Sequence, residues 1–64
     1  MVAEDIGHDG TIYRVVQQGP ALYEVQRKRP GGRKFASMGV YCLSLEAATR
    51  YVQDWIKEVA ARDG

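Results

Sequence analysis

The sequence predicts an α+β domain in which a three-stranded antiparallel sheet carries one C-terminal α-helix across one face. Three segments rich in β-branched, aromatic or alternating residues are separated by Gly and Pro, which is typical of strands and turns. After the third segment, apolar residues recur every three or four positions, as in a helix. One helix can cover only one face of a sheet, so we expect the other face to stay open.

The first two strands are expected at residues 11–18, "TIYRVVQQ", and 22–29, "LYEVQRKR", with Gly19 and Pro20 in the turn between them. Residues 1–10 show little periodicity and end in "HDG", so we expect a flexible leader. A single β-β-β-α domain would then span residues 11–62.

The third strand is expected at residues 34–42, because "PGGR" at 30–33 is the strongest turn signal and favours a hairpin. Gly39 inside this strand indicates a bulge or a close backbone approach. Ser44 is a good N-cap for the helix that follows. The apolar stripe of that helix consists of Leu45, Ala48, Tyr51, Val52, Trp55, Ile56 and Val59.

Alternation along the strands predicts which side chains the helix covers. Tyr13 and Val15 of the first strand and Tyr23 and Val25 of the second should face the helix. In the third strand the buried set should be Ala36, Met38 and Val40, although a bulge at Gly39 would reverse one half. The open face would then hold Ile12, Arg14, Val16, Gln18, Glu24, Gln26, Lys28, Phe35, Ser37 and Tyr41.

The inventory of reactive side chains is poor for catalysis. The single histidine, His8, lies in the expected leader, and the single cysteine, Cys42, cannot form an intramolecular disulfide. We expect a solvated histidine, a cysteine that packs as a small apolar side chain, no enzyme activity and no metal or small-molecule cofactor. No apolar run is long enough for a membrane span, and the acidic N-terminal decapeptide is unlike a signal peptide, so we expect a cytoplasmic protein without membrane partners.

Basic residues concentrate in the middle of the chain. Residues 11–42 carry six Lys or Arg and one acid, and "RKRPGGRK" at 27–34 places five of those bases around the second turn. A basic hairpin can enter the DNA major groove and contact phosphates. A solvated sheet end protected from aggregation would have the same composition.

The segments "TIYRVVQQGPALYEVQRKRP" and "MGVYCLSLEAATRYV" resemble the ethylene-response-factor type of DNA-binding domain and its relatives at the N-termini of phage and transposon integrases. The resemblance covers about 45 residues and rests on matched positions in the strands, turn and helix start. These positions are Tyr13, Arg14, Pro20, Glu24, Gln26, Lys28, Met38, Gly39, Tyr41, Glu46, Ala47, Ala48 and Tyr51.

The resemblance implies binding of double-stranded DNA through the uncovered sheet face, where that family uses arginines and tryptophans. Arg14 matches one of these positions. Where the family has the others, this sequence has Gln17, Ala21, Phe35 and Ser37. Together with the hairpin bases, the expected DNA-binding residues are Arg14, Gln17, Glu24, Gln26, Arg27, Lys28, Arg29, Arg33 and Lys34.

The alternative is a protein-interaction module, such as a small adaptor or a phage-type inhibitor, which could also be a homodimer. It would use the same open face or a sheet edge. Apolar anchors for a protein partner would be Ile12, Val16, Phe35 and Tyr41.

Overall fold

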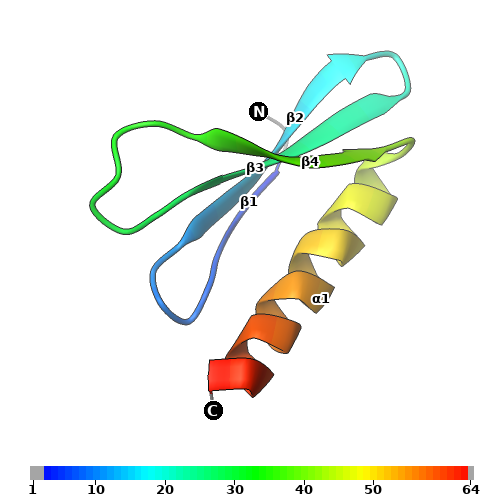
Figure 1. Ribbon diagram of the computed structural model, residues 1–64. Coiled ribbons are helices and arrows are strands. Elements are labelled where there is room, and N and C mark those ends of the chain that lie inside the picture. The colour runs from blue at the N-terminus through cyan, green and yellow to red at the C-terminus, as the bar shows by residue number, and fades with distance from the viewer. Residues whose placement is uncertain (1–2, 64) are drawn as a thin grey trace.

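The computed structural model describes residues 3–63, with side chains to residue 62, as four strands followed by one helix (Figure 1). The strands are β1 (Ala3–Ile6), β2 (Ile12–Gly19), β3 (Leu22–Lys28) and β4 (Ala36–Cys42), and the helix is α1 (Leu45–Asp63). Sequential neighbours pair antiparallel in the order β1-β2-β3-β4. The α+β class and the single C-terminal helix are confirmed, whereas the expected number of three strands is wrong.

The additional strand, β1, lies within the segment expected to be a leader. It pairs with β2 in a register that sets Ala3 opposite Val15 and Ile6 opposite Ile12. Its four residues, "AEDI", do not show the alternation of apolar and polar residues that predicts a strand. Two of them, Glu4 and Asp5, are exposed acids at the edge of the sheet. Short, charged edge strands are common, since they discourage pairing with other chains. Pairing with β2 therefore defines β1 more than its own composition does.

A tight turn joins β1 to β2. The Gly7 amide donates to the Thr11 carbonyl over 2.8 Å, and Gly10 has a φ of 90°, which favours glycine. The Asp9 carboxylate accepts a hydrogen bond from the Thr11 amide at 3.0 Å. Hydrogen bonds from Thr11 backbone and side chain lower the pKa of Asp9, so this carboxylate holds the turn best when ionised.

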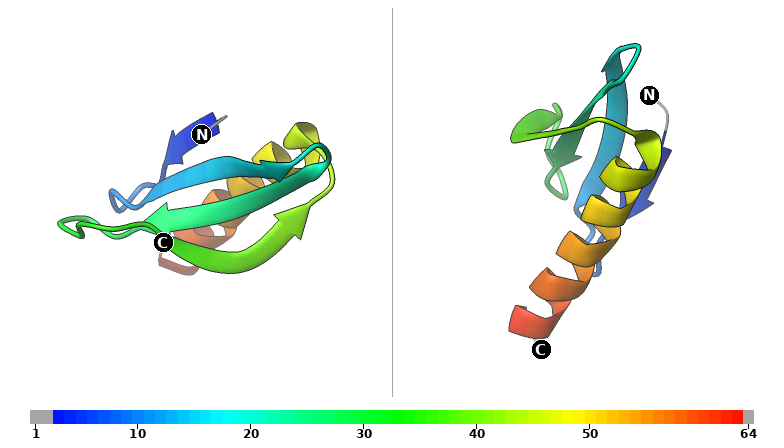
Figure 2. Two further views of the ribbon diagram at one scale, coloured as in Figure 1. Left: turned by 90° about the horizontal axis from the view of Figure 1, so that it is seen from above. Right: turned by 90° about the vertical axis from the view of Figure 1, so that its right-hand side faces the viewer.

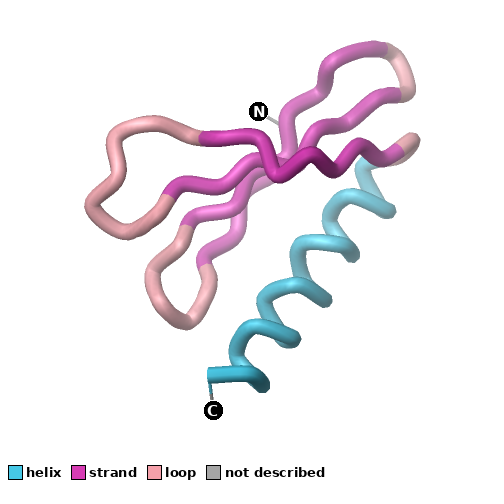
Figure 3. The backbone as a smooth tube through the Cα atoms, in the orientation of Figure 1, coloured by secondary structure: helices cyan, strands magenta, loops and turns pink. Residues whose placement is uncertain are grey.

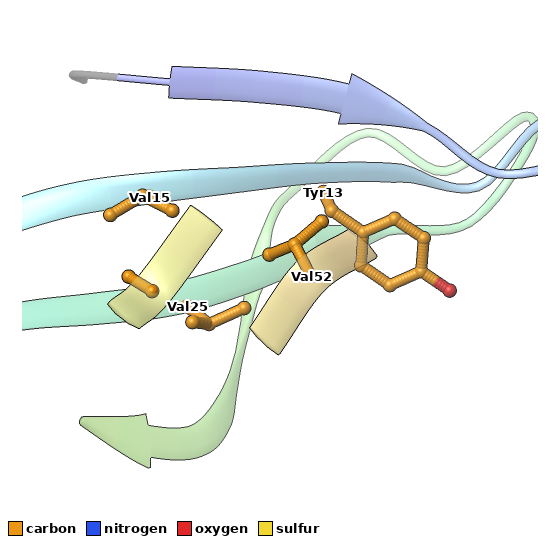
Figure 4. Close-up of a cluster of buried hydrophobic side chains, with 5 residues drawn as sticks. Tyr13, Val15, Val25 and Val52 are labelled. Carbon is orange, nitrogen blue, oxygen red and sulfur yellow. The ribbon is translucent and has the colours of Figure 1, made fainter. Parts of the chain in front are cut away.

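The core lies between α1 and one face of the sheet. Five described apolar residues are buried there: Tyr13, Val15, Val25, Ala48 and Val52 (Figure 4). Tyr23 and Trp55 pack around them, and the Trp55 indole donates to the Tyr13 hydroxyl over 3.2 Å. The prediction that Tyr13, Val15, Tyr23 and Val25 face the helix is confirmed.

The start of α1 also follows the prediction. The Ser44 hydroxyl accepts a hydrogen bond from the Ala47 amide at 3.1 Å, which satisfies one of the free donors at the helix N-terminus. From there the helix crosses the sheet on a single side (Figures 1 and 2). The opposite side of the sheet has no covering element among residues 3–63. No helix in this range is long and apolar enough to cross a membrane.

The bulge predicted at Gly39 is present in β4. Val25 pairs with Val40, but the next residue of β3, Gln26, pairs with Ser37, so two extra residues interrupt β4. Gly39 has a φ of 72°, and the insertion of two residues, instead of one, preserves the alternation. Ser37 and Tyr41 therefore remain on the open face, and the reversal considered from the sequence does not occur.

Candidate nucleic-acid interface

A hydrogen-bonded carboxylate lies at the centre of the open face. Glu24, on β3, is paired with Val16 on one side and Tyr41 on the other, and only 8% of it is exposed. Its carboxylate accepts hydrogen bonds from Gln26 Nε2 at 2.6 Å, Gln18 Nε2 at 3.1 Å and the Tyr41 hydroxyl at 3.0 Å. An open sheet face with an enclosed carboxylate is unlike a simple solvated surface.

The hydrogen-bond partners of Glu24 among the described residues are all neutral. Burial of a carboxylate is costly unless hydrogen bonds replace its hydration. Hydrogen bonds from Gln26 and Ser37, followed by those from Tyr41 and Gln18, outweigh the opposing effect of burial and lower the pKa of Glu24. The lowered pKa keeps the carboxylate ionised at neutral pH, and no described side chain forms an ion pair with it.

Gln26 connects this carboxylate to Arg14. The Gln26 side chain donates from Nε2 to Glu24 and accepts from Arg14 Nε, the latter over 2.7 Å. An amide has one donor side and one acceptor side, so the bond to Glu24 sets which end of Gln26 faces Arg14. Glu24 thus positions Arg14 through Gln26.

The Arg14 guanidinium also stacks on an aromatic ring. Its Cζ lies 3.8 Å from the centroid of Phe35, and Lys28 Nζ lies 5.4 Å from the same centroid. Stacked cations on an aromatic face are stabilised by the ring's quadrupole. Among residues 3–62, Arg14 makes its one hydrogen bond through Nε, which leaves both terminal nitrogens available to an external acceptor.

The remaining bases lie at the same end of the sheet as Lys28. The β3–β4 loop projects from that end, beside the β1–β2 turn (Figure 3). It carries Arg29, Arg33 and Lys34, all exposed. Within the described side chains, none of these three bases forms an ion pair; the ion pair that does form there joins Arg62 to Glu58 on α1 at 2.6 Å.

The structure separates the nine expected DNA-binding residues into three groups. Arg14, Glu24, Gln26 and Lys28 lie together on the open face, and Arg29, Arg33 and Lys34 lie in or beside the loop. Gln17 pairs with Tyr23, and Arg27 pairs with Tyr13, so these two lie on the helix side of the sheet. Gln17 donates to the nearby Gly19 carbonyl and contributes nothing to the open face.

The contacts of three side chains on the open face could not be predicted from the sequence. Phe35 was expected only as an apolar anchor, yet it is the ring on which Arg14 and Lys28 stack. Gln18 and Tyr41 were placed on this face without the bonds that they make to Glu24. The alternation of side chains along the strands identified the face on which these residues lie. Their contacts depend on the register of β2 and β4 against β3, which the sequence does not show.

Large apolar side chains are exposed at both ends of the sheet: Ile6, 60% exposed, lies at the end with the bases, where it pairs with Ile12. Leu43 is 78% exposed, and Leu22 and Leu45 are also exposed near the β2–β3 turn and the start of α1. On the open face, Tyr41 is 55% exposed, whereas Ile12 and Val16 are half-buried. The exposed leucines therefore lie at the end away from the bases, whereas Ile6 adds an exposed apolar side chain to the end with the bases.

Groups that could hold a metal ion do not converge in the described chain. No three His, Cys, Asp or Glu side chains of residues 3–62 are arranged to hold a metal ion. Cys42 has no disulfide and packs, half-buried, against the core. No protein-family model, curated protein or solved structure matches the chain.

Proposed function

We propose that the protein is a non-enzymatic module that binds double-stranded DNA through the open sheet face and the β3–β4 hairpin. The observation that carries this proposal is the arrangement of cations at one end of the sheet. Arg14 and Lys28 share the Phe35 ring, and Arg29, Arg33 and Lys34 extend from the adjoining loop without carboxylate partners among the described residues.

The chemistry of this surface suits a polyanion with hydrogen-bond acceptors. Phosphate contacts from Lys and Arg supply most of the affinity of DNA-binding proteins, and a two-stranded ribbon fits the major groove. The terminal nitrogens of Arg14 form a planar fork that suits phosphate or base-edge acceptors.

The resemblance to the ethylene-response-factor type of domain is part of this proposal, since that family also uses the uncovered face of its sheet. A cytoplasmic location belongs to the proposal as well. The unpaired thiol of Cys42 supports it, because thiols are kept reduced in that compartment.

Titration of a labelled DNA duplex at two salt concentrations tests the proposal. We expect the logarithm of the affinity to fall linearly with the logarithm of the salt concentration. Replacing Arg14 and Lys28 by Gln should lower the slope by about 2, since each phosphate contact contributes about 0.9. The matched control, R50Q/K57Q, removes two exposed charges from α1 and should leave the slope unchanged. Absence of binding by the wild-type protein at low salt would contradict the proposal.

A protein-interaction module is the second candidate, and the exposed Tyr41 favours it. Tyrosine and arginine are enriched among the residues that contribute most to protein interfaces, and Tyr41 and Arg14 share the open face. Homodimerisation through this face would double the mass measured by light scattering, and Tyr41→Ala would restore the monomer. A wild-type protein that is monomeric at all concentrations would exclude the homodimer.

A further inference from the structure

A second group of cations lies on the helix side of the β3–β4 hairpin. A surface depression of about 360 Å³ is lined there by Arg27, Arg29, Gly32, Lys34 and Ala36. Arg27 pairs with Ala36, and Arg29 and Lys34 continue the same alternation beyond the ends of the two strands. Three bases, one from β3 and two from the adjoining loop, thus border one hollow.

Gly32 lies at the rim of this hollow, in a tight turn between Arg29 and Lys34. The Gly32 amide donates to the Arg29 carbonyl over 2.9 Å, and a Cβ at Gly32 would lie 3.0 Å from that oxygen. A larger residue would therefore force the turn to shift. A side chain at residue 32 would also come within 3.5 Å of Lys28 Cγ, so glycine suits the close approach of the chain at this turn.

The two sides of the hairpin are both cationic. Lys28 and Arg14 lie on the open side around Phe35, whereas Arg27, Arg29 and Lys34 lie on the helix side. Alternation along a strand separates neighbouring residues such as Arg27 and Lys28 onto opposite faces. A flat ligand on the open face could contact only one of these two groups.

We infer that the depression bordered by Arg27, Arg29 and Lys34 binds a backbone phosphate of the same duplex that the open side contacts. This inference rests on the proposed function and adds a second, helix-side contact to it. A hairpin with bases on both sides can lie in the major groove, about 12 Å wide, with one phosphate backbone beside each side. Arginine forks suit the phosphate oxygens, and a partner of this charge removes the mutual repulsion of the three bases.

The test is the salt dependence of duplex binding by R27Q/R29Q/K34Q, compared with the wild-type protein. Loss of two or three phosphate contacts should lower the slope by about 2 to 3. The control R50Q/K57Q/R62Q removes the same charge from α1 and should keep the wild-type slope. Thermal melting checks that the variants fold. Should the triple variant not fold, the loop variant K34Q alone should lower the slope by about 1.

The outcomes separate the inference from the proposed function. A wild-type protein that binds no duplex overturns both. A wild-type protein that binds with a normal salt dependence, together with an unchanged slope for R27Q/R29Q/K34Q or for K34Q, overturns only the helix-side contact. A reduced slope in both the triple variant and R14Q/K28Q supports contacts on the two sides of the hairpin.

Discussion

The two faces of the sheet bury side chains of different kinds. On the helix side, Val15 and Val25 are paired with each other and excluded from water by α1, with 2% and 0% of each exposed. On the open side, Glu24 is almost as enclosed, but hydrogen bonds from neutral side chains stabilise it. The first face is stabilised by the hydrophobic effect, whereas the second depends on a polar network.

Under the proposed function, the two faces have separate tasks in a very small domain. The apolar face supplies the stability of folding, and its side chains are unavailable to partners. The polar network positions Arg14 and leaves its terminal nitrogens available. A rigid arrangement of polar side chains on an uncovered face is more useful for binding than for folding, because each buried polar group must be satisfied before it contributes anything.

The largest expected effect is the loss of stability when an aspartate is placed on the helix-covered face instead of the open face. Val25→Asp places an unpaired carboxylate in the core and should abolish the cooperative unfolding transition, a loss of more than about 4 kcal/mol. Ile12→Asp makes the same kind of change on the open face opposite Lys28 and should leave the protein folded. Urea denaturation followed by circular dichroism checks both. Equal destabilisation by the two changes would contradict the distinction between the faces.

Substitution within the polar network should have a smaller effect. Glu24→Gln replaces an oxygen acceptor by an amide donor, which then faces the donors of Gln18 and Gln26. We expect the free energy of unfolding to fall by about 1 to 3 kcal/mol. Glu4→Gln, an exposed carboxylate on β1, is the control and should change the stability little. An E24Q protein with the same free energy of unfolding as the wild type would show that the network contributes nothing to folding.

The pH dependence of stability tests whether the ionised form of Glu24 stabilises the open face. The folded-state pKa of Glu24 lies below its usual value of 4.5 because of the hydrogen bonds from Gln26 and Ser37. Its contribution to stability is therefore present above about pH 4.5 and is lost as the pH falls through the folded pKa. The stability difference between wild type and E24Q should narrow over that range. Asp9 also titrates in this range, but it is present in both proteins, so its effect cancels in the difference between them. A difference in the free energy of unfolding that does not change with pH would argue against an ionised Glu24.

Much of the helix-covered face could be predicted from the sequence, because it depends on periodicity. Tyr13, Val15, Tyr23 and Val25 were identified from alternation alone, and Ser44 from its position before the apolar stripe. The strand β1 could not be predicted in this way, since its residues become a strand by pairing with β2.

The candidate interface was only partly predictable for a related reason. Parity placed Arg14, Gln26 and Lys28 together, and the structure agrees. The bond from Arg14 to Gln26 and the stacking on Phe35 depend on the register between strands and on the double insertion in β4. Arg27 and Gln17 were included because of their charge or their place in a resemblance, although alternation assigns both to the helix side.

The smallest expected effect concerns the bulge that preserves the alternation of β4. In Gly39→Ala the added Cβ causes no clash, since nothing lies within 4 Å of it. However, alanine must then adopt the left-handed backbone conformation, with a φ of 72°. We expect a loss of about 1 to 2 kcal/mol, measured by thermal melting. Gly19→Ala, where φ is not in that region and the added Cβ lies 3.8 Å from Leu22, is the control. Equal melting temperatures for G39A and the wild type would contradict the importance of this conformation.

The division between a folding face and a binding face is tested most directly by amide chemical-shift mapping during titration with a DNA duplex. The account predicts that the perturbed amides belong to the open face and the β3–β4 hairpin, around Arg14, Lys28 and Phe35, while Ala48 and Val52 in α1 stay unchanged. Perturbations centred on the exposed side of α1, or no perturbation at low salt, would contradict it.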